Sequence, residues 1–360
     1  MLPSRFALIP MSLRVQDQRR SLVSRLFPDG IPQLWCPPIT HYTPDGAIDI
    51  PRVEAHLASL SPHVGGLLAS GSTGDGWELD DARYRSVVRT DLAAASRHSY
   101  RVLIGALRNT PVEVQQRIQD WMVEFGSPAN TDAAVSALAH RRVGAFTICG
   151  PVGAQLPVAD INAALIRGLE TGLPLSIYQL PQVTGYNLSA ETLAHLAARF
   201  PNFLLFKDTS GEDVVATAET PLPGVFLVRG AEGDYLRWLG LAGGPYHGFL
   251  LSSANCFAKQ LREMMDAARE GRMDLARTRS AQVSAVMRDL FAVVQPVIGG
   301  NAFANANKVA DHFMAYGPRG AAATPPRLST GQALSADILA QGRAVLARHQ
   351  LLPTRGYLEV

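Results

Sequence analysis

Short apolar runs alternate with longer segments of helical periodicity over most of this chain, and this alternation is the strongest constraint on its fold. The runs predict eight β-strands, at residues 33–36, 66–69, 101–104, 145–149, 173–178, 203–207, 225–228 and 247–251. Strands that alternate with helices predict an α/β protein with a mostly parallel sheet. Eight such units favour a closed (β/α)8 TIM barrel, because an open doubly wound sheet usually has fewer strands and a glycine-rich phosphate turn after its first.

The two ends of the chain depart from this alternation. Residues 1–29 predict an N-terminal extension that contains a surface helix over 12–27. Beyond residue 271 the pattern becomes helical throughout, with helices predicted at 273–294, 305–316 and 335–349. The sequence therefore predicts three parts: the extension 1–29, a (β/α)8 catalytic barrel at 30–270, and a C-terminal helical region at 271–360 that packs on the barrel.

Composition excludes several classes of protein. Of the 360 residues 47% are hydrophobic and 18% charged, which is too apolar for a disordered chain. A formal net charge of +2 without a basic tract argues against a nucleic-acid partner. No apolar run approaches the ~20 residues of a membrane span. Three widely spaced cysteines, Cys36, Cys149 and Cys256, predict reduced, core-lining thiols in a cytoplasmic protein.

Lysine is scarce, and the position of one lysine is informative. Only three of the 33 Lys+Arg residues are lysines, and Lys207 ends the apolar run 203–206. Arginine stays protonated, whereas the pKa of a lysine falls readily when its ammonium is desolvated, so a lysine can form a Schiff base with a carbonyl. The alternative is a strand-end lysine that extends to solvent.

Chemistry in such a barrel takes place at the carboxyl ends of the strands, which makes the residues that end each run candidates for a site. Besides Lys207, these are the turn Gly71–Asp75, Tyr178 and residues 250–252. A tyrosine hydroxyl can carry the proton needed to form and break a carbinolamine, and the turn can hold a carboxylate. Together they suit a 2-oxo acid, although Tyr178 could instead simply bury its ring.

Three motifs occur in a specific order: Gly-Ser-Thr-Gly-Asp at 71–75, Ile-Tyr-Gln-Leu-Pro at 177–181 followed by Thr184-Gly185, and Phe-Lys-Asp-Thr-Ser-Gly at 206–211. Over roughly residues 30–269 the chain resembles the dihydrodipicolinate synthase/N-acetylneuraminate lyase family. The resemblance implies a class I aldolase-like, homo-oligomeric enzyme, a dimer or tetramer. It also implies that Lys207 forms an imine with pyruvate or another 2-oxo acid.

The resemblance also assigns roles to individual residues. Lys207, Tyr178 and Thr73 are expected to be catalytic, with Tyr178 as the proton carrier. Substrate contacts are expected from Gly71, Ser72, Thr73, Thr209 and Leu250, of which Ser72 and Thr73 would hold the carboxylate. Asp75 stands where the family commonly has glutamate and is expected to order the turn.

Two departures from the family pattern narrow the substrate. Val183 occupies the position at which true dihydrodipicolinate synthases carry a carboxylate-binding arginine. The Pro-Tyr-Tyr segment that often follows the fourth strand is replaced by Gly150–Gln155, so Tyr178 would work with substrate, water or Thr73. The chain is therefore not expected to be a true dihydrodipicolinate synthase.

No metal and no organic cofactor are expected. The nine histidines show no ligand spacing with acidic residues, with His247 and His312 isolated, and no Gly-x-x-x-x-Gly-Lys-Ser/Thr loop is present. We expect a Schiff-base-forming lyase that cleaves or condenses a pyruvate-type 2-oxo acid. A 2-keto-3-deoxy sugar-acid dehydratase that uses the same imine and a non-catalytic barrel that binds 2-oxo acids stay open as alternatives.

Overall fold

The computed structural model describes residues 9–359 and contains a closed barrel of eight strands. The strands follow one another around the barrel in sequence order, and the registered pairs are parallel. They are β1 (Leu34–Cys36), β2 (Gly66–Ala69), β3 (Arg101–Gly105), β4 (Val143–Ile148), β5 (Leu175–Gln179), β6 (Phe203–Asp208), β7 (Phe226–Arg229) and β8 (Gly248–Leu250). The predicted TIM barrel with C-terminal helices is confirmed.

Six helices of two or more full turns follow or separate strands as expected from the periodicity: α2 (Ile50–Leu60), α3 (Asp81–His98), α4 (Pro111–Glu124), α6 (Val158–Leu169), α8 (Ala190–Arg199) and α11 (Ala254–Arg269). Side-chain caps begin several of them. Thr110 and Glu113 form a reciprocal capping box on α4, and Asp80 and Ser189 accept from backbone N–H groups of α3 and α8.

Some helices differ from the sequence prediction. Two segments of helical periodicity, at 212–219 and 232–242, predict helices but contain only the single turns α9 (Val214–Thr217) and α10 (Tyr235–Trp238). Asp213 and Asp234, with φ of 56° and 50°, precede these turns in the left-handed region, which starts each turn abruptly. Another single turn, α7 (Pro181–Thr184), follows β5, and α5 (Thr131–His140) is a helix that the sequence analysis did not predict.

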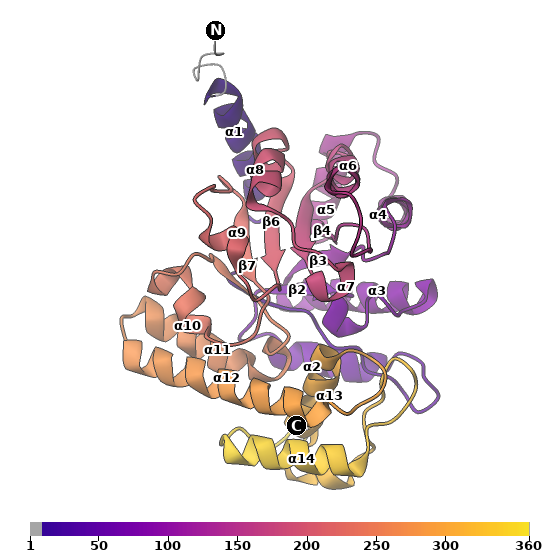
Figure 1. Cartoon of the computed structure of the whole chain (residues 1–360). Helices are drawn as coiled ribbons and strands as arrows, with labels where there is room; N and C mark the ends of the chain where they lie inside the picture. The colour runs from indigo at the N-terminus through magenta and orange to yellow at the C-terminus, as the bar shows by residue number, and fades with distance from the viewer. Residues whose placement is uncertain (1–8, 360) are drawn as a thin grey trace. The chain divides into compact units, whose positions relative to one another are not determined.

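Backbone contacts group the chain into two compact units. The first comprises residues 1–33, 103–231 and 245–248. In it, α1 (Ile9–Leu26) packs against α5 and α8, so the helix predicted near the N-terminus is present (Figure 1). Arg19 of α1 is 1% exposed and donates to the carbonyl oxygens of Ala197, Phe200 and Phe203. This arginine caps the C-terminal end of α8 from another helix.

The second unit comprises residues 34–102, 232–244 and 249–360 and contains the C-terminal helices. Here α12 (Met273–Val294) packs along α11, α13 (Ala302–Tyr316) and α14 (Ala336–Arg348) (Figure 1). The boundaries predicted at residues 29 and 270 stay a prediction. Among the helices of residues 9–359, none is both long enough and apolar enough to cross a bilayer.

Candidate active site

Lys207 and Tyr178 lie side by side on neighbouring strands of the first unit. The register of β5 and β6 pairs Tyr178 with Lys207, and that of β4 and β5 pairs Ile148 with Ile177. The residue after Ile148 is Cys149, which therefore comes next in the same row. The Cys149 thiol thus comes just beyond the end of β4, followed by the Tyr178 phenol on β5 and the Lys207 amine on β6.

The Lys207 amine rests on the face of the Tyr178 ring. Its Nζ lies 3.9 Å from the ring centre, and both residues are only 3% exposed. The π-face attracts an ammonium and holds the amine in place, while the phenol hydroxyl lies at the ring edge. Lys207 also acts on Cys149: burial raises the pKa of this thiol, and the positive charge of Lys207 opposes that rise.

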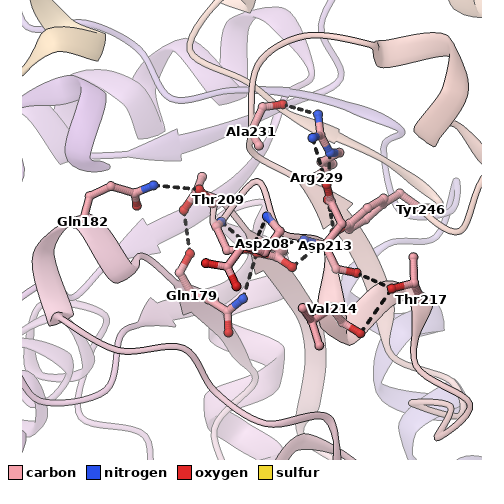
Figure 2. A network of polar contacts seen from close by, with 12 residues as sticks. Gln179, Gln182, Asp208, Thr209, Asp213, Val214, Thr217, Arg229, Ala231 and Tyr246 are labelled. Atoms are coloured by element: carbon pink, nitrogen blue, oxygen red, sulfur yellow. Dashed lines mark hydrogen bonds and ion pairs between the residues drawn. The ribbon is translucent and has the colours of Figure 1, made fainter. Parts of the chain in front are cut away.

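A buried polar network supports the strand end that carries Lys207 (Figure 2). Successive residues of a strand point to opposite faces, so Asp208 and Lys207 point in opposite directions. The Asp208 carboxylate accepts from Gln179 Nε2 and Ser210 N, both at 2.9 Å, and from the Tyr246 hydroxyl at 3.2 Å. These bonds tie the end of β6 to that of β5.

The same network continues to β7. Arg229 forms a bidentate ion pair with Asp213, with N–O distances of 2.8 and 2.9 Å, and both residues are buried. The Tyr246 hydroxyl donates to Asp213 at 2.7 Å, so it joins the two carboxylates. Burial raises the pKa of Tyr246, and Asp208 and Asp213 add to that shift, which keeps the phenol protonated.

Sequence reasoning missed this network. Arg229 ends a strand and Asp213 follows the lysine motif. A charged residue at either of these buried positions could have indicated the network. The residues that pair, however, lie far apart in sequence: Arg229 is 16 residues from Asp213, and Tyr246 is 33 residues from it.

Thr209 lies just past the lysine and bonds to the neighbouring strand. Both its N–H and its hydroxyl donate to the carbonyl oxygen of Gln179, the hydroxyl at 2.5 Å, and Gln182 Nε2 donates to Thr209 O at 3.0 Å. The Thr209 hydroxyl proton is therefore used within the protein. Its oxygen can act toward a substrate only as an acceptor.

The Gly71–Asp75 turn belongs to the second unit. Ser72–Gly74 form one 3-10 turn after β2, and Asp75 ends it in the left-handed region with φ of 58°. Trp77 Nε1 donates to Ser72 Oγ at 2.9 Å, and Asn301 at the start of α13 donates to Ser72 O at the same distance. Ser72 and Thr73 are 8% and 5% exposed, so their hydroxyls sit in a nearly dry turn.

Asp75 anchors this turn to α13. Its Oδ2 accepts from the Lys308 ammonium and from the Tyr42 hydroxyl, each at 2.9 Å, and the Lys308–Asp75 pair is fully buried. Burial raises the pKa of Tyr42, and the adjacent Asp75 carboxylate raises it further. These contacts support the ordering role expected for Asp75; Lys308 was not predicted as its partner.

Leu250 also belongs to the second unit, on β8, and is completely buried. After β8, the Ser252 hydroxyl donates to Glu232 at 2.6 Å, and Glu232 also accepts from the Tyr235 hydroxyl at 2.7 Å. The Glu232 carboxylate therefore fixes the turn that follows the strand of Leu250.

Two histidines expected to lack acidic neighbours prove to have one. In the second unit His41 and His56 lie beside Asp311, with potential ligand atoms within 4.8 Å of one another, so the expectation that the histidines form no such group is wrong here. Residues 41, 56 and 311 are too far apart in sequence for a spacing rule to connect them.

The donor set of this cluster fits an ion-pair network rather than a metal. Arg52 Nη2 lies 2.6 Å from one Asp311 oxygen, and the Tyr357 hydroxyl donates to the other at 2.9 Å. His56 Nε2 donates to a backbone carbonyl, which leaves its Nδ1 to accept from His41 at 3.2 Å. A cation would meet the Arg52 charge and would have to displace both partners of Asp311.

Comparisons with known proteins agree with this architecture. A model of the dihydrodipicolinate synthetase family matches residues 163–298. A 4-hydroxy-tetrahydrodipicolinate synthase of Parasynechococcus marenigrum is 25% identical over 72% of this chain and 80% of its own length. The enzyme of the same name from Xanthomonas axonopodis pv. citri is 28% identical over 68% of this chain and 75% of its own.

Solved structures give the same result for the fold. YagE from E. coli K12, a member of the dihydrodipicolinic acid synthase family solved in complex with pyruvate, superposes with a TM-score of 0.68 at 20% identity, covering 89% of this chain and 99% of YagE. The 2-keto-3-deoxygluconate aldolase of Sulfolobus solfataricus gives 0.67 at 14% identity, covering 88% and 96%. The chain is thus similar over most of its length to synthases and aldolases of the dihydrodipicolinate synthetase family, whose members are aldolase-type lyases.

Proposed function

We propose that the protein is a Schiff-base-forming lyase that cleaves or condenses a pyruvate-type 2-oxo acid through an imine on Lys207. The observation that carries this proposal is the buried Lys207 amine on the ring of Tyr178, at 3.9 Å from the ring centre. A desolvated amine beside a phenol combines a nucleophile with a proton carrier. The pyruvate complex of the structurally similar YagE supports the same substrate class.

In the proposed mechanism, neutral Lys207 attacks the C2 carbonyl and forms a carbinolamine. Tyr178 donates the proton that leaves with the C2 oxygen as water, which gives an iminium. The C3–C4 bond then breaks: its electron pair moves into the enamine, and the C4 hydroxyl loses its proton to become an aldehyde. Protonation of the enamine at C3 and hydrolysis release pyruvate and regenerate the amine.

We also propose roles for the other predicted site residues. Ser72 and Thr73, with the backbone of Gly71, are assigned to the substrate carboxylate, supported by the family motif and by the well-fixed turn around them. Thr73 is assigned the further role of passing protons with Tyr178. Thr209 and Leu250 are assigned to the rest of the substrate.

Val183 supports an acceptor that is not aspartate semialdehyde, because an apolar side chain cannot receive a second carboxylate. The family resemblance supports a homo-oligomeric cytoplasmic enzyme.

Trapping of the imine tests the proposal. Incubation with pyruvate and borohydride should attach the reduced ligand to Lys207, as located by peptide mass mapping, and Lys207→Arg should abolish the adduct. The matched control is Lys259→Arg, which changes an exposed lysine and should leave trapping unchanged. An adduct on Lys259 or Lys308, or no adduct with any 2-oxo acid, would contradict the proposed function.

A further inference from the structure

Helix α13 contacts both ends of the 3-10 turn that follows β2. Asn301, the N-cap of α13, donates from Nδ2 to Ser72 O at 2.9 Å, while its Oδ1 accepts from Ala304 N at 2.8 Å. Seven residues further along, about two helical turns, Lys308 Nζ lies 2.9 Å from Asp75 Oδ2. One helix therefore holds the residue that begins the turn and the residue that ends it.

The contact made by Lys308 is closed to solvent. Lys308 and Asp75 are 2% and 0% exposed, and the Tyr42 hydroxyl donates to the same Asp75 oxygen at 2.9 Å. The Lys308 ammonium also lies 4.7 Å from the centre of the Tyr42 ring. Separating the ammonium from the carboxylate would leave both charges buried and unpaired, so the pair keeps a single arrangement.

This pair supports a turn whose backbone is strained. Asp75 has φ of 58°, a conformation that residues other than glycine adopt infrequently. The Asp75 N–H donates to Ser72 O at 3.1 Å, so the Ser72 carbonyl accepts both from the end of the turn and from Asn301. A strained backbone persists only where the contacts around it over-determine its conformation. The shape of this turn therefore depends on α13.

The hydroxyls of Ser72 and Thr73 lie between these two anchors. Ser72 Oγ accepts from Trp77 Nε1 at 2.9 Å, which leaves the Ser72 proton to be donated elsewhere. The two residues are only 8% and 5% exposed, so a ligand must meet their hydroxyls in the orientation that the turn imposes.

We propose that Lys308 is a positioning residue, whose ion pair with Asp75 lets α13 set the affinity of the Ser72–Thr73 turn for a carboxylate. The inference rests on the proposed function, which assigns this turn to the substrate carboxylate. It gives the C-terminal helical region a part in substrate selection. A purely structural ion pair would affect every ligand equally, whereas a positioning role affects only ligands that carry a carboxylate.

The primary test compares pyruvate with methyl pyruvate, which keeps the C2 carbonyl but has no charged carboxylate. The rate of borohydride trapping on Lys207 is measured against the concentration of each ligand, which gives a half-saturating concentration and a maximal rate. The variant is Lys308→Met/Asp75→Asn. It removes both charges together, so the net charge is unchanged and neither partner is left buried and unpaired.

We expect the half-saturating concentration of pyruvate to rise about 10-fold in this variant, as for loss of a well-aligned hydrogen bond to a charged group. The maximal rate, and both values for methyl pyruvate, should stay within about twofold of wild type. Equal changes for the two ligands, or an unchanged value for pyruvate, would overturn the role of Lys308.

Asn301→Ser tests the other anchor and does not disturb the ion pair. Serine is an equally good N-cap, so α13 should begin at the same residue, but serine has no amide to donate to Ser72 O. We expect the half-saturating concentration of pyruvate to rise about 3-fold, as for loss of one neutral hydrogen bond, with methyl pyruvate unaffected. An unchanged pyruvate value in Asn301→Ser would contradict the dependence of the turn on α13.

Arg279→Met/Glu263→Gln is the matched control. It neutralises an ion pair of the same unit that joins α12 to α11 at 2.7 Å, and it should leave both ligands unaffected. If the wild type traps neither ligand, the proposed function fails and this inference falls with it. If the wild type traps both ligands and Lys308→Met/Asp75→Asn does not discriminate between them, only the inference about Lys308 fails.

Discussion

At the scale of single residues, the ring and the hydroxyl of Tyr178 stand in different relations to Lys207. The ring face holds the amine, at 3.9 Å from its centre, whereas the hydroxyl is proposed to move protons. Substitution by phenylalanine retains the first property and removes the second.

We therefore expect Tyr178→Phe to form the reducible pyruvate imine on Lys207 more slowly, because Tyr178 is proposed to donate the proton that leaves with the C2 oxygen as water. Its kcat for aldol cleavage should fall about 10²- to 10⁴-fold, the usual contribution of a positioned proton carrier. Single-turnover kinetics with borohydride quenching would measure the two steps separately. A Phe variant that turns over at the wild-type rate would remove Tyr178 from the mechanism.

At the scale of secondary-structure elements, a buried arginine of α1 bonds to the rest of its unit. The guanidinium of Arg19 bonds to carbonyl oxygens at the end of α8 and on β6, including Phe203 O at 2.9 Å. Burial lowers the pKa of Arg19 from 12.5 to about 10, so the charge is retained at neutral pH. A charged donor in these bonds is stronger than a neutral one.

Arg19→Met keeps the aliphatic stem but removes the guanidinium donors from those carbonyls. We expect the free energy of unfolding to fall by about 3 kcal/mol, measured by urea denaturation. Arg20→Met is the matched control, because Arg20 is its exposed neighbour and pairs with Asp17 on the surface; it should change stability by less than about 0.5 kcal/mol. Similar losses in both variants would argue against the capping role of Arg19.

At the scale of the whole molecule, buried histidines make stability depend on pH. Burial lowers the pKa values of His41 and His56, although Asp311 partly opposes this. In the unfolded chain these histidines take up protons near pH 6.5, whereas the folded protein resists protonation. Stability is therefore lost as pH falls through that value, because the unfolded state then binds more protons. For Asp311 the balance is the opposite. Burial would raise its pKa, but Arg52 and the two histidines lower it. Its contribution to stability is therefore lost only below about pH 4.

The expected result is an unfolding free energy that decreases between pH 7 and pH 5.5. Each of the two histidines contributes a slope of at most about 1.4 kcal/mol per pH unit. His41→Gln removes one titrating group and should make the decline shallower, which chemical denaturation at several pH values would measure. An identical slope in this variant would assign the acid sensitivity to other groups.

The sequence by itself determined the parts of the protein that depend on local patterns. Apolar runs of four to six residues marked all eight strands, and Lys207, Tyr178 and the 71–75 turn could be placed at strand ends because a strand and the residue that ends it are adjacent in the chain. The lengths of α9 and α10 were overestimated from the helical periodicity. Asp213 and Asp234, in the left-handed region, and the glycines near them keep each helix to a single turn.

Only the tertiary structure decided which distant residues meet. Asp75 pairs with Lys308 across 233 positions, Arg19 reaches Phe203 across 184, and Tyr186 fills the space above Gly150. Such pairings are set by how strands close into a barrel and helices pack against it, and many partners at those separations would satisfy the same local pattern. Lys207 could thus be placed from the sequence, whereas the network of Asp208, Asp213 and Arg229 around the end of its strand could be found only in the folded chain.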